Sequence, residues 1–347
     1  MAADMICMRD TSTNGSRMLR LSISQRTWPL KSPFTISRGA RSEAHTLVVT
    51  LGDDEGNRGS GEAVPYARYD ETMQAAMDEL EAARPAIEAG ITHDQIPALL
   101  KLRAARNALD CALWDLRAKQ QGKPAWQLAA LDAPRPLTTA YTISLASPGE
   151  MARVAGENSS RPLLKLKLGS ASAADDMARL KAVRAAAPGS RLIVDANEGW
   201  REDDLPMLLE TCAENAVKLV EQPLPAERDA VLSAIPRPVP VCADESFHDA
   251  ADLPRLAGRY DAVNIKLDKS GGLTPALEAA ERALAAGFSL MCGCMLASSL
   301  AMAPAFLVAR KARWTDLDGP LLLASDAHPP IKYQGSTMYP PERELWG

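Results

Sequence analysis

The segment 163–266 decides the fold of this chain, because five short apolar runs recur in it: LLKLKL (163–168), LIVD (192–195), KLVE (218–221), VPVCAD (239–244) and AVNIK (262–266). Each run has the length of a β-strand, and stretches with a helical pattern separate them. Three further runs of this kind occur at 138–144, 289–292 and 314–317. Eight strands alternating with helices predict a (β/α)8-type barrel. A doubly wound open sheet is the alternative, but no GxGxxG motif follows the first of these strands.

The N-terminal third has a different pattern. Apolar runs at 19–26 and 44–51 predict strands, and Asp53-Asp-Glu-Gly56 predicts a hairpin turn after the second of them. Ala-rich helical patterns follow at 71–88 and 98–121. We therefore expect four parts along the chain: a flexible arm at 1–17, an α+β capping domain at 18–135, the barrel at 136–324, and a C-terminal segment at 325–347 that packs on the capping domain.

Composition excludes several classes of function. The 347 residues carry a net charge of −5, without a basic block, and aromatic residues make up only 5%. Neither feature fits a nucleic-acid-binding surface. Residues 283–309 are uncharged and long enough to span a bilayer, but Gly287, Gly293 and Pro304 interrupt them, which favours a buried core. We expect no membrane contact.

The cysteines and the N-terminus both indicate a cytoplasmic protein. Six cysteines are scattered without a CxxC pair, as is typical of reduced thiols in the cytoplasm. The first 17 residues lack the long apolar core of a secretory signal.

Ionisable residues stand where five consecutive barrel strands end: Lys167, Asp195, Glu221, Asp244 and Lys266. In a parallel barrel these ends share one rim, where active sites lie. Three neighbouring carboxylates would repel one another, and a divalent cation removes that conflict. Oxygen ligands without His or Cys favour Mg²⁺. Each acid could instead cap the helix that follows it, but three acids on consecutive strands favour the metal site.

The lysines suggest acid–base chemistry. Lys165 and Lys167 lie two apart on one strand and so point to the same side. Lys266 lies four strands further round the barrel, so a lysine would stand over each face of a substrate held between them. That arrangement suits proton abstraction beside a carboxylate, with inversion of the carbon, provided that burial and neighbouring cations lower the lysine pKa. Simple pairing of the lysines with the carboxylates is the alternative.

These residues resemble the enolase superfamily, in its muconate-lactonising-enzyme subgroup, over about residues 18–335. The motifs that carry the resemblance are 105–110 (ARNALD), 112–116 (ALWDL), 194–197 (VDAN), 221–223 (EQP), 243–246 (ADES) and 264–267 (NIKL). The resemblance implies a modified TIM barrel, (β/α)7β, with an N-terminal α+β capping domain completed by the C-terminal tail. It further implies one Mg²⁺ per subunit on Asp195, Glu221 and Asp244, Lys167 and Lys266 as bases, an enediolate intermediate, and a homo-oligomer.

The eighth strand distinguishes the members of this subgroup. Its Asp316-Leu-Asp318 is similar to the DxD of dipeptide epimerases, in which two acids hold the α-ammonium of the dipeptide, and a buried ammonium needs such partners. The similarity is greatest to the epimerases that interconvert L-Ala-D-Glu and L-Ala-L-Glu in murein peptide recycling. The resemblance also implies substrate contacts and residues beside the metal ligands: Thr142, Lys165, Cys294, Asp316, Asp318 and Arg38 or Arg41 for the substrate, Asn197 and Glu245 beside the metal.

Other functions remain open. N-acylamino-acid racemases and o-succinylbenzoate synthases share the barrel residues but have no use for the two acids of the eighth strand. A non-catalytic metal- or peptide-binding relative would need neither base. Some epimerases carry an acid after the seventh strand, whereas Cys294-Met-Leu-Ala297 is neutral here, which bears on specificity.

Overall fold

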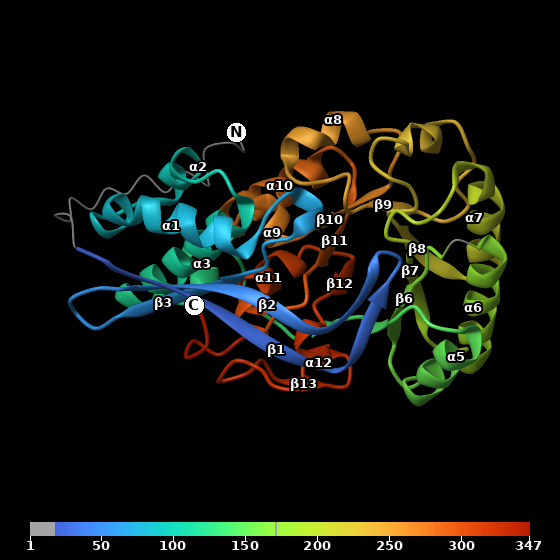
Figure 1. The fold of residues 1–347 in the computed structure, drawn as a ribbon, viewed down its shortest axis with the longest axis horizontal. Coiled ribbons are helices and arrows are strands. Elements are labelled where there is room, and N and C mark those ends of the chain that lie inside the picture. The colour runs from blue at the N-terminus through green and yellow to red at the C-terminus, as the bar shows by residue number, and fades with distance from the viewer. Residues whose placement is uncertain (1–17, 171) are drawn as a thin grey trace.

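The computed structural model describes residues 18–170 and 172–347. The arm expected at residues 1–17 lies outside the described residues. Figure 1 shows an antiparallel sheet with helices (blue to teal) on one side of the molecule and a barrel (green to red) on the other, with a long hairpin of the sheet reaching across the barrel.

The barrel has the predicted eight parallel strands. They are β5 (Tyr141–Ile143), β6 (Leu163–Lys167), β7 (Arg191–Asp195), β8 (Val217–Glu221), β9 (Val241–Ala243), β10 (Ala262–Ile265), β11 (Ser289–Gly293) and β12 (Trp314–Asp316). They pair in chain order, from β5 to β12. An isolated parallel bridge between Thr139 and Thr315 brings the chain before β5 to β12, so the barrel is nearly closed.

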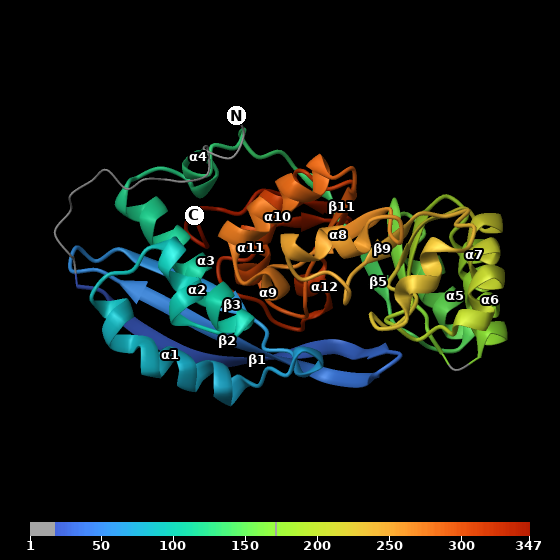
Figure 2. The ribbon, with the colours of Figure 1, turned by 90° about the horizontal axis from the view of Figure 1, so that it is seen from above.

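Helices cover the outside of this barrel between its strands (Figure 2). The longer ones are α5 (Pro148–Glu157), α6 (Ala173–Ala186), α7 (Leu205–Glu214), α10 (Leu273–Ala285) and α11 (Ser299–Ala309). Short helices at strand ends and loops are η3 (Glu202–Asp204), η4 (Asp229–Ser233), η5 (Ala250–Asp252), α8 (Leu253–Leu256), α9 (Leu267–Ser270) and α12 (Gly319–Leu322).

The connection from β8 to β9 departs from the expected pattern, because it holds only the 3-10 helix η4. Pro223, Pro225, Pro236, Pro238 and Pro240 lie in this connection. Because proline cannot continue a helix, Pro225 and Pro236 confine any helix in this connection to the residues between them.

The capping region consists of one antiparallel sheet and the helices packed on it. Its elements are β1 (Arg20–Ile36), β2 (Gly39–Gly52), β3 (Arg58–Ala63), η1 (Ala67–Tyr69), α1 (Met73–Glu88), η2 (His93–Gln95), α2 (Ile96–Leu99), α3 (Arg103–Gln120) and α4 (Ala125–Leu128). The predicted turn at 53–56 joins β2 to β3. A Cβ atom on Gly59 or Gly61 would lie 2.2 Å from backbone atoms of α3, so glycine lets the strand approach that helix.

The helical pattern predicted at 98–121 is interrupted in the structure, because residues 100–102 separate α2 from α3. Glu79 accepts hydrogen bonds from the backbone N–H groups of Lys101 and Leu102. Glu71 accepts those of Arg103 and Ala104. The two carboxylates thus satisfy donors at the beginning of α3, a tertiary contact that replaces helical hydrogen bonds.

The C-terminal tail returns to the capping region, as expected. Strands β13 (Tyr333–Gln334) and β14 (Thr337–Met338) form a small sheet with β4 (Leu137–Thr138). Thr138, which was predicted to begin a barrel strand at 138–144, therefore pairs with the tail instead. Trp346 Nε1 donates to the carbonyl of Cys111, and the N–H of Gly347 donates to Asp115, both on α3.

Two expectations concern the molecule as a whole. Within the described residues, no helix combines the length and the apolar character needed to cross a bilayer. The five cysteines of the described residues are free thiols, as predicted, and four of them are buried.

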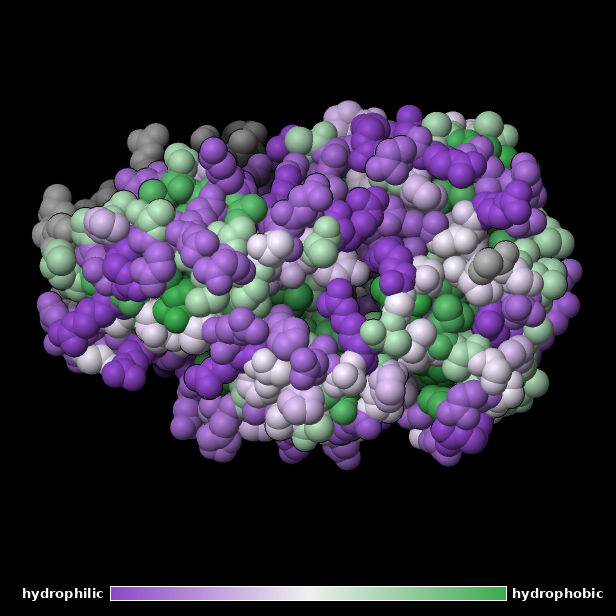
Figure 3. Space-filling view, in the orientation of Figure 1, coloured by the Kyte–Doolittle hydropathy of each residue, from purple (hydrophilic) through white to green (hydrophobic). Residues whose placement is uncertain are grey.

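The face in Figure 3 is covered mainly by hydrophilic residues and is hollowed near its centre.

One apolar layer closes the bottom of the barrel. Each strand, or the residue just before it, contributes one buried side chain to this layer: Ala140, Leu163, Ile193, Leu219, Cys242, Ala262, Met291 and Trp314. Residues two or four positions further along a strand point to the same side. The ionisable residues at the strand ends therefore face the barrel interior directly above this layer.

Candidate active site

A cavity of about 170 Å³ opens above the ionisable residues at the strand ends. Barrel residues at strand ends line one side of it, and residues of the β1–β2 hairpin and of η1 line the other. Most of the predicted site residues are among its walls: Arg38, Arg41, Thr142, Lys165, Lys167, Asn197, Asp244, Glu245, Lys266, Cys294, Asp316 and Asp318. Asp195 and Glu221 are completely buried beside them.

The predicted metal ligands are bound to lysines. Lys165 Nζ lies 3.1 Å from Asp195 Oδ2, 2.6 Å from Glu221 Oε2 and 2.7 Å from Asp316 Oδ2. Asp244 accepts from Lys266, at 2.7 Å. Among the described residues, no three His, Cys, Asp or Glu side chains converge as a ready-made metal cage. The acids and the ammonium groups neutralise one another in this arrangement. It is the simple pairing of lysines with carboxylates that the sequence offered as the alternative to acid–base chemistry.

The two predicted bases face the cavity from opposite sides of the barrel. Lys167 ends β6 and Lys266 follows β10, and three strands separate β6 from β10. Lys167 Nζ lies 2.6 Å from Asp195 Oδ2 and over the ring of Phe34. Burial alone would lower the pKa of Lys266, but Asp244 and Glu221 raise it well above its ordinary value. The expected fall of the pKa is therefore not found for Lys266 beside unscreened carboxylates.

The carboxylates titrate unequally. Burial would raise the pKa of Asp195, but Lys165 and Lys167 hold it below its ordinary value. Glu221 has the opposite shift, because burial and the charge of Asp195 raise its pKa to about 8. Buried acids that shift in opposite directions mark a site of dense, unbalanced charge, as functional sites commonly are.

Several buried oxygens near the cavity lack partners. Oδ1 of Asn197, Oε2 of Glu245 and Oδ1 of Asp316 accept no hydrogen bond from the described part of the chain. Buried acceptors are normally satisfied, so unpaired ones at a cavity indicate a ligand or an ion. The predicted ligands Asp195, Glu221 and Asp244 offer only carboxylate oxygens, a donor type that fits a hard cation such as Mg²⁺.

The two acids of the eighth strand also face the cavity. Asp316 ends β12 and pairs with Lys165, whereas Asp318 accepts a hydrogen bond of 2.6 Å from the backbone N–H of Thr142. Burial and the charge of Asp316 raise the pKa of Asp318 to about 7. A cation placed between these acids would relieve their repulsion. Cys294 also lines the cavity, and its side chain is half-buried.

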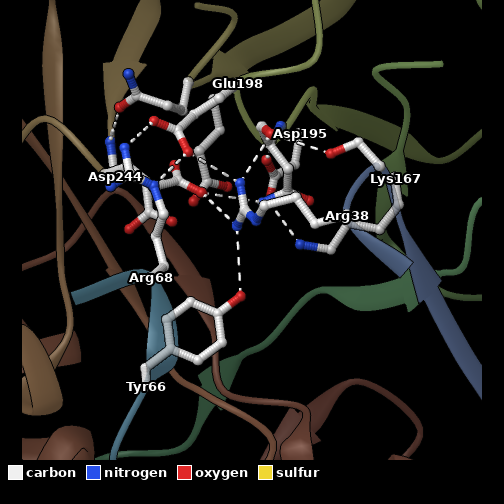
Figure 4. Close-up of polar contacts among 12 residues, drawn as sticks. Arg38, Tyr66, Arg68, Lys167, Asp195, Glu198 and Asp244 are labelled. Atoms are coloured by element: carbon white, nitrogen blue, oxygen red, sulfur yellow. Dashed lines mark hydrogen bonds and ion pairs between the residues drawn. The ribbon is translucent and has the colours of Figure 1, made fainter. Parts of the chain in front are cut away.

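The capping side of the cavity is shown in Figure 4. Arg38, at the tip of the β1–β2 hairpin, donates to Glu245 Oε1 at 2.8 Å and to the carbonyl of Asn197 at 2.9 Å. Arg41 stands over the ring of Tyr66, at 5.4 Å from its centroid. Thus Arg38 is held by barrel residues, and Arg41 remains beside the cavity on an aromatic face.

Sequence reasoning missed several residues of this site. The ammonium of Lys269 is completely buried and lies 2.6 Å from Asp244 Oδ1. Asn264 donates to Glu221 Oε1 at 2.6 Å. Asn264 lies two residues before Lys266, so the strand period could have placed it on the interior face. Glu198 and Arg68, by contrast, meet from distant parts of the chain, and no local pattern announces their contact.

The site also depends on one close backbone approach. A Cβ atom on Gly293, at the end of β11, would lie 2.8 Å from the amide of Asn264 and 3.1 Å from Cε of Lys266. Glycine at this position leaves the room that the Lys266 side chain occupies on its way to the cavity.

Comparisons with known proteins agree with the fold. Residues 18–129 match the mandelate racemase/muconate lactonizing enzyme N-terminal domain, and residues 150–344 match the enolase C-terminal domain-like family. The L-Ala-D/L-Glu epimerase of Escherichia coli (strain K12) is 43% identical over 91% of this chain and 98% of its own. An N-acetyl-D-glutamate racemase of Pseudoalteromonas sp. is 44% identical over 87% of this chain and 95% of its own.

Solved structures of similar fold include dipeptide epimerases and their relatives. An enolase family member from Agrobacterium tumefaciens, with homology to dipeptide epimerases and with bound sodium and L-Ala-L-Glu, is 50% identical, with a TM-score of 0.92. The alignment covers 95% of this chain and 100% of that one. A dipeptide epimerase from Methylococcus capsulatus, complexed with Mg and L-Arg-D-Lys, is 30% identical, with a TM-score of 0.87 over 95% of this chain and 99% of that one.

These findings define an isomerase of the racemase and epimerase type, as the sequence predicted. The chain belongs to the mandelate racemase/muconate lactonizing enzyme family of the enolase superfamily. The predicted barrel with its N-terminal cap is confirmed.

Proposed function

We propose that this protein is a Mg²⁺-dependent dipeptide epimerase that inverts the α-carbon of the C-terminal residue, with Lys167 and Lys266 as its two bases. The observation that carries the proposal is the position of these lysines, which enter one cavity from opposite sides of the barrel. A substrate between them presents one face of its α-carbon to each ammonium or amine. Removal of the proton on one face and return on the other inverts the centre.

The proton balance requires one lysine to be neutral when the other is charged. In one direction Lys167 takes the α-proton and Lys266 returns its own, and the reverse reaction exchanges the roles. The carboxylates that raise the pKa of Lys266 oppose its action as a base. Positive charge beside Asp244 would offset that effect and bring the amine closer to neutral pH.

We propose Asp195, Glu221 and Asp244 as the ligands of that positive charge. When bound to these residues, Mg²⁺ would supply a Lewis acid for negative charge on the substrate carboxylate. Its binding would replace ammonium contacts of the same carboxylates. Asn197 and Glu245 have unpaired buried oxygens beside the ligands and would orient them. Lys165 would then be free to meet the substrate carboxylate.

Two acids favour a dipeptide over an N-acyl amino acid. Asp316 and Asp318 line the cavity, and the free α-ammonium of a dipeptide would pair with them. Thr142 and Cys294 would pack against the peptide. The N-acyl group of an N-acyl amino acid carries no positive charge that could pair with these two acids. The 44% identity to an N-acetyl-D-glutamate racemase nevertheless keeps N-acylamino-acid racemization as the second candidate.

We propose glutamate as the inverted residue and Arg41 as the contact of its side chain. Glutamate is named in both the epimerase and the racemase relatives. Arg38, the other possible contact, is occupied by Glu245, Glu198 and the Asn197 carbonyl. Arg41 lines the cavity and is exposed, so its guanidinium is available to a carboxylate.

We further propose that the reaction converts L-Ala-D-Glu to L-Ala-L-Glu during murein peptide recycling in the cytoplasm. The enzyme would act as a homo-oligomer with one Mg²⁺ per subunit. The capping domain would end near residue 135 and the barrel near residue 324.

Proton NMR in D₂O tests the reaction and the substrate together. L-Ala-L-Glu with the protein and Mg²⁺ should lose its Glu α-proton signal while the L-Ala-D-Glu diastereomer grows. A chelator should stop both changes, and excess Mg²⁺ should restore them. Exchange with N-acetyl-glutamate but not with the dipeptide would replace the first candidate by the second. Absence of exchange with both substrates would refute the proposed function.

A further inference from the structure

A nearly buried carboxylate, Glu198, lies just outside the proposed catalytic groups. It follows Asp195 and Asn197 on the loop after β7, and its side chain is 8% exposed. Both Asn197 and Glu198 have left-handed backbone conformations, with φ of 45° and 66°. Such conformations are costly for residues other than glycine, so the surrounding structure must hold this loop in place.

Two arginines of the capping region converge on this carboxylate. Arg68, in η1, donates twice to it, from Nε to Oε2 at 2.9 Å and from Nη2 to Oε1 at 2.7 Å. Arg38, at the hairpin tip, donates from Nη1 to Oε2 at 3.1 Å. Figure 4 shows both arginines beside Glu198. One barrel carboxylate thus joins two cap segments that lie about 30 residues apart in the chain.

The same contacts lead directly to the proposed metal ligands. Arg38 donates to the carbonyl of Asn197 at 2.9 Å, and the N–H of Asn197 donates to Asp195 Oδ1, also at 2.9 Å. The second arm of Arg38 pairs with Glu245, the neighbour of Asp244. The position of the hairpin tip and the position of the barrel carboxylates are therefore linked by hydrogen bonds.

The hairpin tip has few other attachments to the barrel. Its middle is fixed where Pro29 accepts from the N–H of Ala324 and where Leu30 bridges Leu323. From Phe34 onward, the barrel contacts that the structure shows are the Phe34 ring beneath Lys167 and three polar ones: Leu145 N–H to the Thr35 carbonyl, Ser37 to the Asn197 carbonyl, and Arg38. Residues of this distal half form the outer wall of the cavity.

From these contacts we infer that Glu198 is a positioning residue, which holds the hairpin tip and the η1 loop together over the cavity through Arg38 and Arg68. The carboxylate does not touch the reacting atoms. It keeps the outer wall in place, so that a bound substrate is enclosed. The inference rests on the proposed function only for the choice of substrate in the kinetic part of its test.

The geometry separates this contact from an ordinary surface ion pair. Exposed pairs contribute little because water and salt screen them. Glu198 is nearly buried and accepts three guanidinium hydrogen bonds, two of them from one arginine in the paired arrangement that fixes direction as well as distance. An exposed pair nearby, Arg228 with Glu202, provides the contrast, since its side chains are 61% and 36% exposed.

Hydrogen exchange of the substrate-free protein tests the inference without reference to catalysis. Glu198→Gln keeps the shape of the side chain but removes its charge. Amides of residues 34–41 and 64–70 should exchange about tenfold faster or more, which corresponds to a local opening made easier. Amides of β8 should be unchanged, and Glu202→Gln should change neither region. Unchanged exchange at 34–41 and 64–70 in Glu198→Gln would overturn the inference, and so would equal acceleration throughout the barrel.

Kinetics with L-Ala-L-Glu provide the second arm. A looser outer wall should raise KM about tenfold in Glu198→Gln while kcat changes less than about threefold, because the bases are intact. A fall of kcat with unchanged KM would contradict a positioning role. Should Glu198→Gln fail to fold, Arg68→Met removes the same contact from the cap side. It should accelerate exchange at 34–41 as well as at 64–70, and acceleration confined to 64–70 would refute the link between the two segments.

Discussion

Gln222 offers the sharpest test of how this site is held together. Its side chain is completely buried next to Glu221. The amide oxygen accepts from the backbone N–H groups of Asp244, at 2.8 Å, and Ser246, at 3.0 Å. The amide nitrogen donates to the Leu224 carbonyl and to two hydroxyls. A single side chain therefore fixes the turn that carries one of the proposed metal ligands.

The expected cost of Gln222→Ala follows from these bonds. Two buried backbone donors would lose their acceptor, and each unsatisfied donor costs about 1 to 3 kcal/mol, so the free energy of unfolding should fall by about 2 to 6 kcal/mol. Gln222 also has a φ of 34°. Glycine tolerates that conformation, so Gln222→Gly should be about 1 kcal/mol more stable than Gln222→Ala.

Urea unfolding in the presence of a chelator would measure these differences, because free metal ion would otherwise stabilise the folded state. Gln120→Ala is a matched control: that amide is half-buried, donates to Asp53, and should cost about 1 kcal/mol or less. A loss below about 1 kcal/mol for Gln222→Ala would refute the reasoning, since the turn would then have other means of satisfying its donors.

Three further predictions concern the proposed chemistry and the pH dependence of stability. Lys266→Ala should still exchange the α-proton of one stereoisomer through Lys167 while net epimerization collapses. NMR in D₂O measures both, and equal loss for the two isomers would contradict two separate bases. Asp318→Asn should lower kcat/KM for L-Ala-L-Glu about tenfold or more, because the ammonium loses a charged partner. The value for N-acetyl-glutamate should barely change, and equal losses would argue against an ammonium pocket. Burial raises the pKa of Asp268 to about 6. The folded protein therefore holds this proton more tightly than the unfolded chain does, and stability should fall as the pH rises from about 4 to 6. Asp268→Asn keeps the acceptor oxygen and should flatten that slope and stabilise the protein at pH 7 by at most about 3 kcal/mol, as urea titrations at several pH values would measure. An unchanged slope would show that another group is responsible.

Local pattern was sufficient for the barrel and for the rim where its charges gather. A strand has a period of two, and a parallel barrel points its strand ends to one rim, so Lys167, Asp195 and Glu221 could be placed together before any coordinates. The same logic placed Lys266 opposite them. The pattern predicted element boundaries less well where distant segments supply the hydrogen-bond partners of the backbone. The helix predicted at 98–121 is divided because Glu71 and Glu79 take over backbone donors, and residues 137–138 pair with the tail rather than the barrel.

The sequence by itself determined which residues stand at the barrel rim, because the strand period and the order of the strands along the chain can be read from the sequence. Only the tertiary structure decided their partners. Lys165 meets Asp316 across 151 residues, and Arg38 meets Glu245 across 207. Such contacts depend on how the barrel closes and on how far the cap hairpin reaches. The interaction energy of two buried charges depends on the distance between them, so the pKa of Lys266 and the role of Glu198 follow from those distances as well as from residue type.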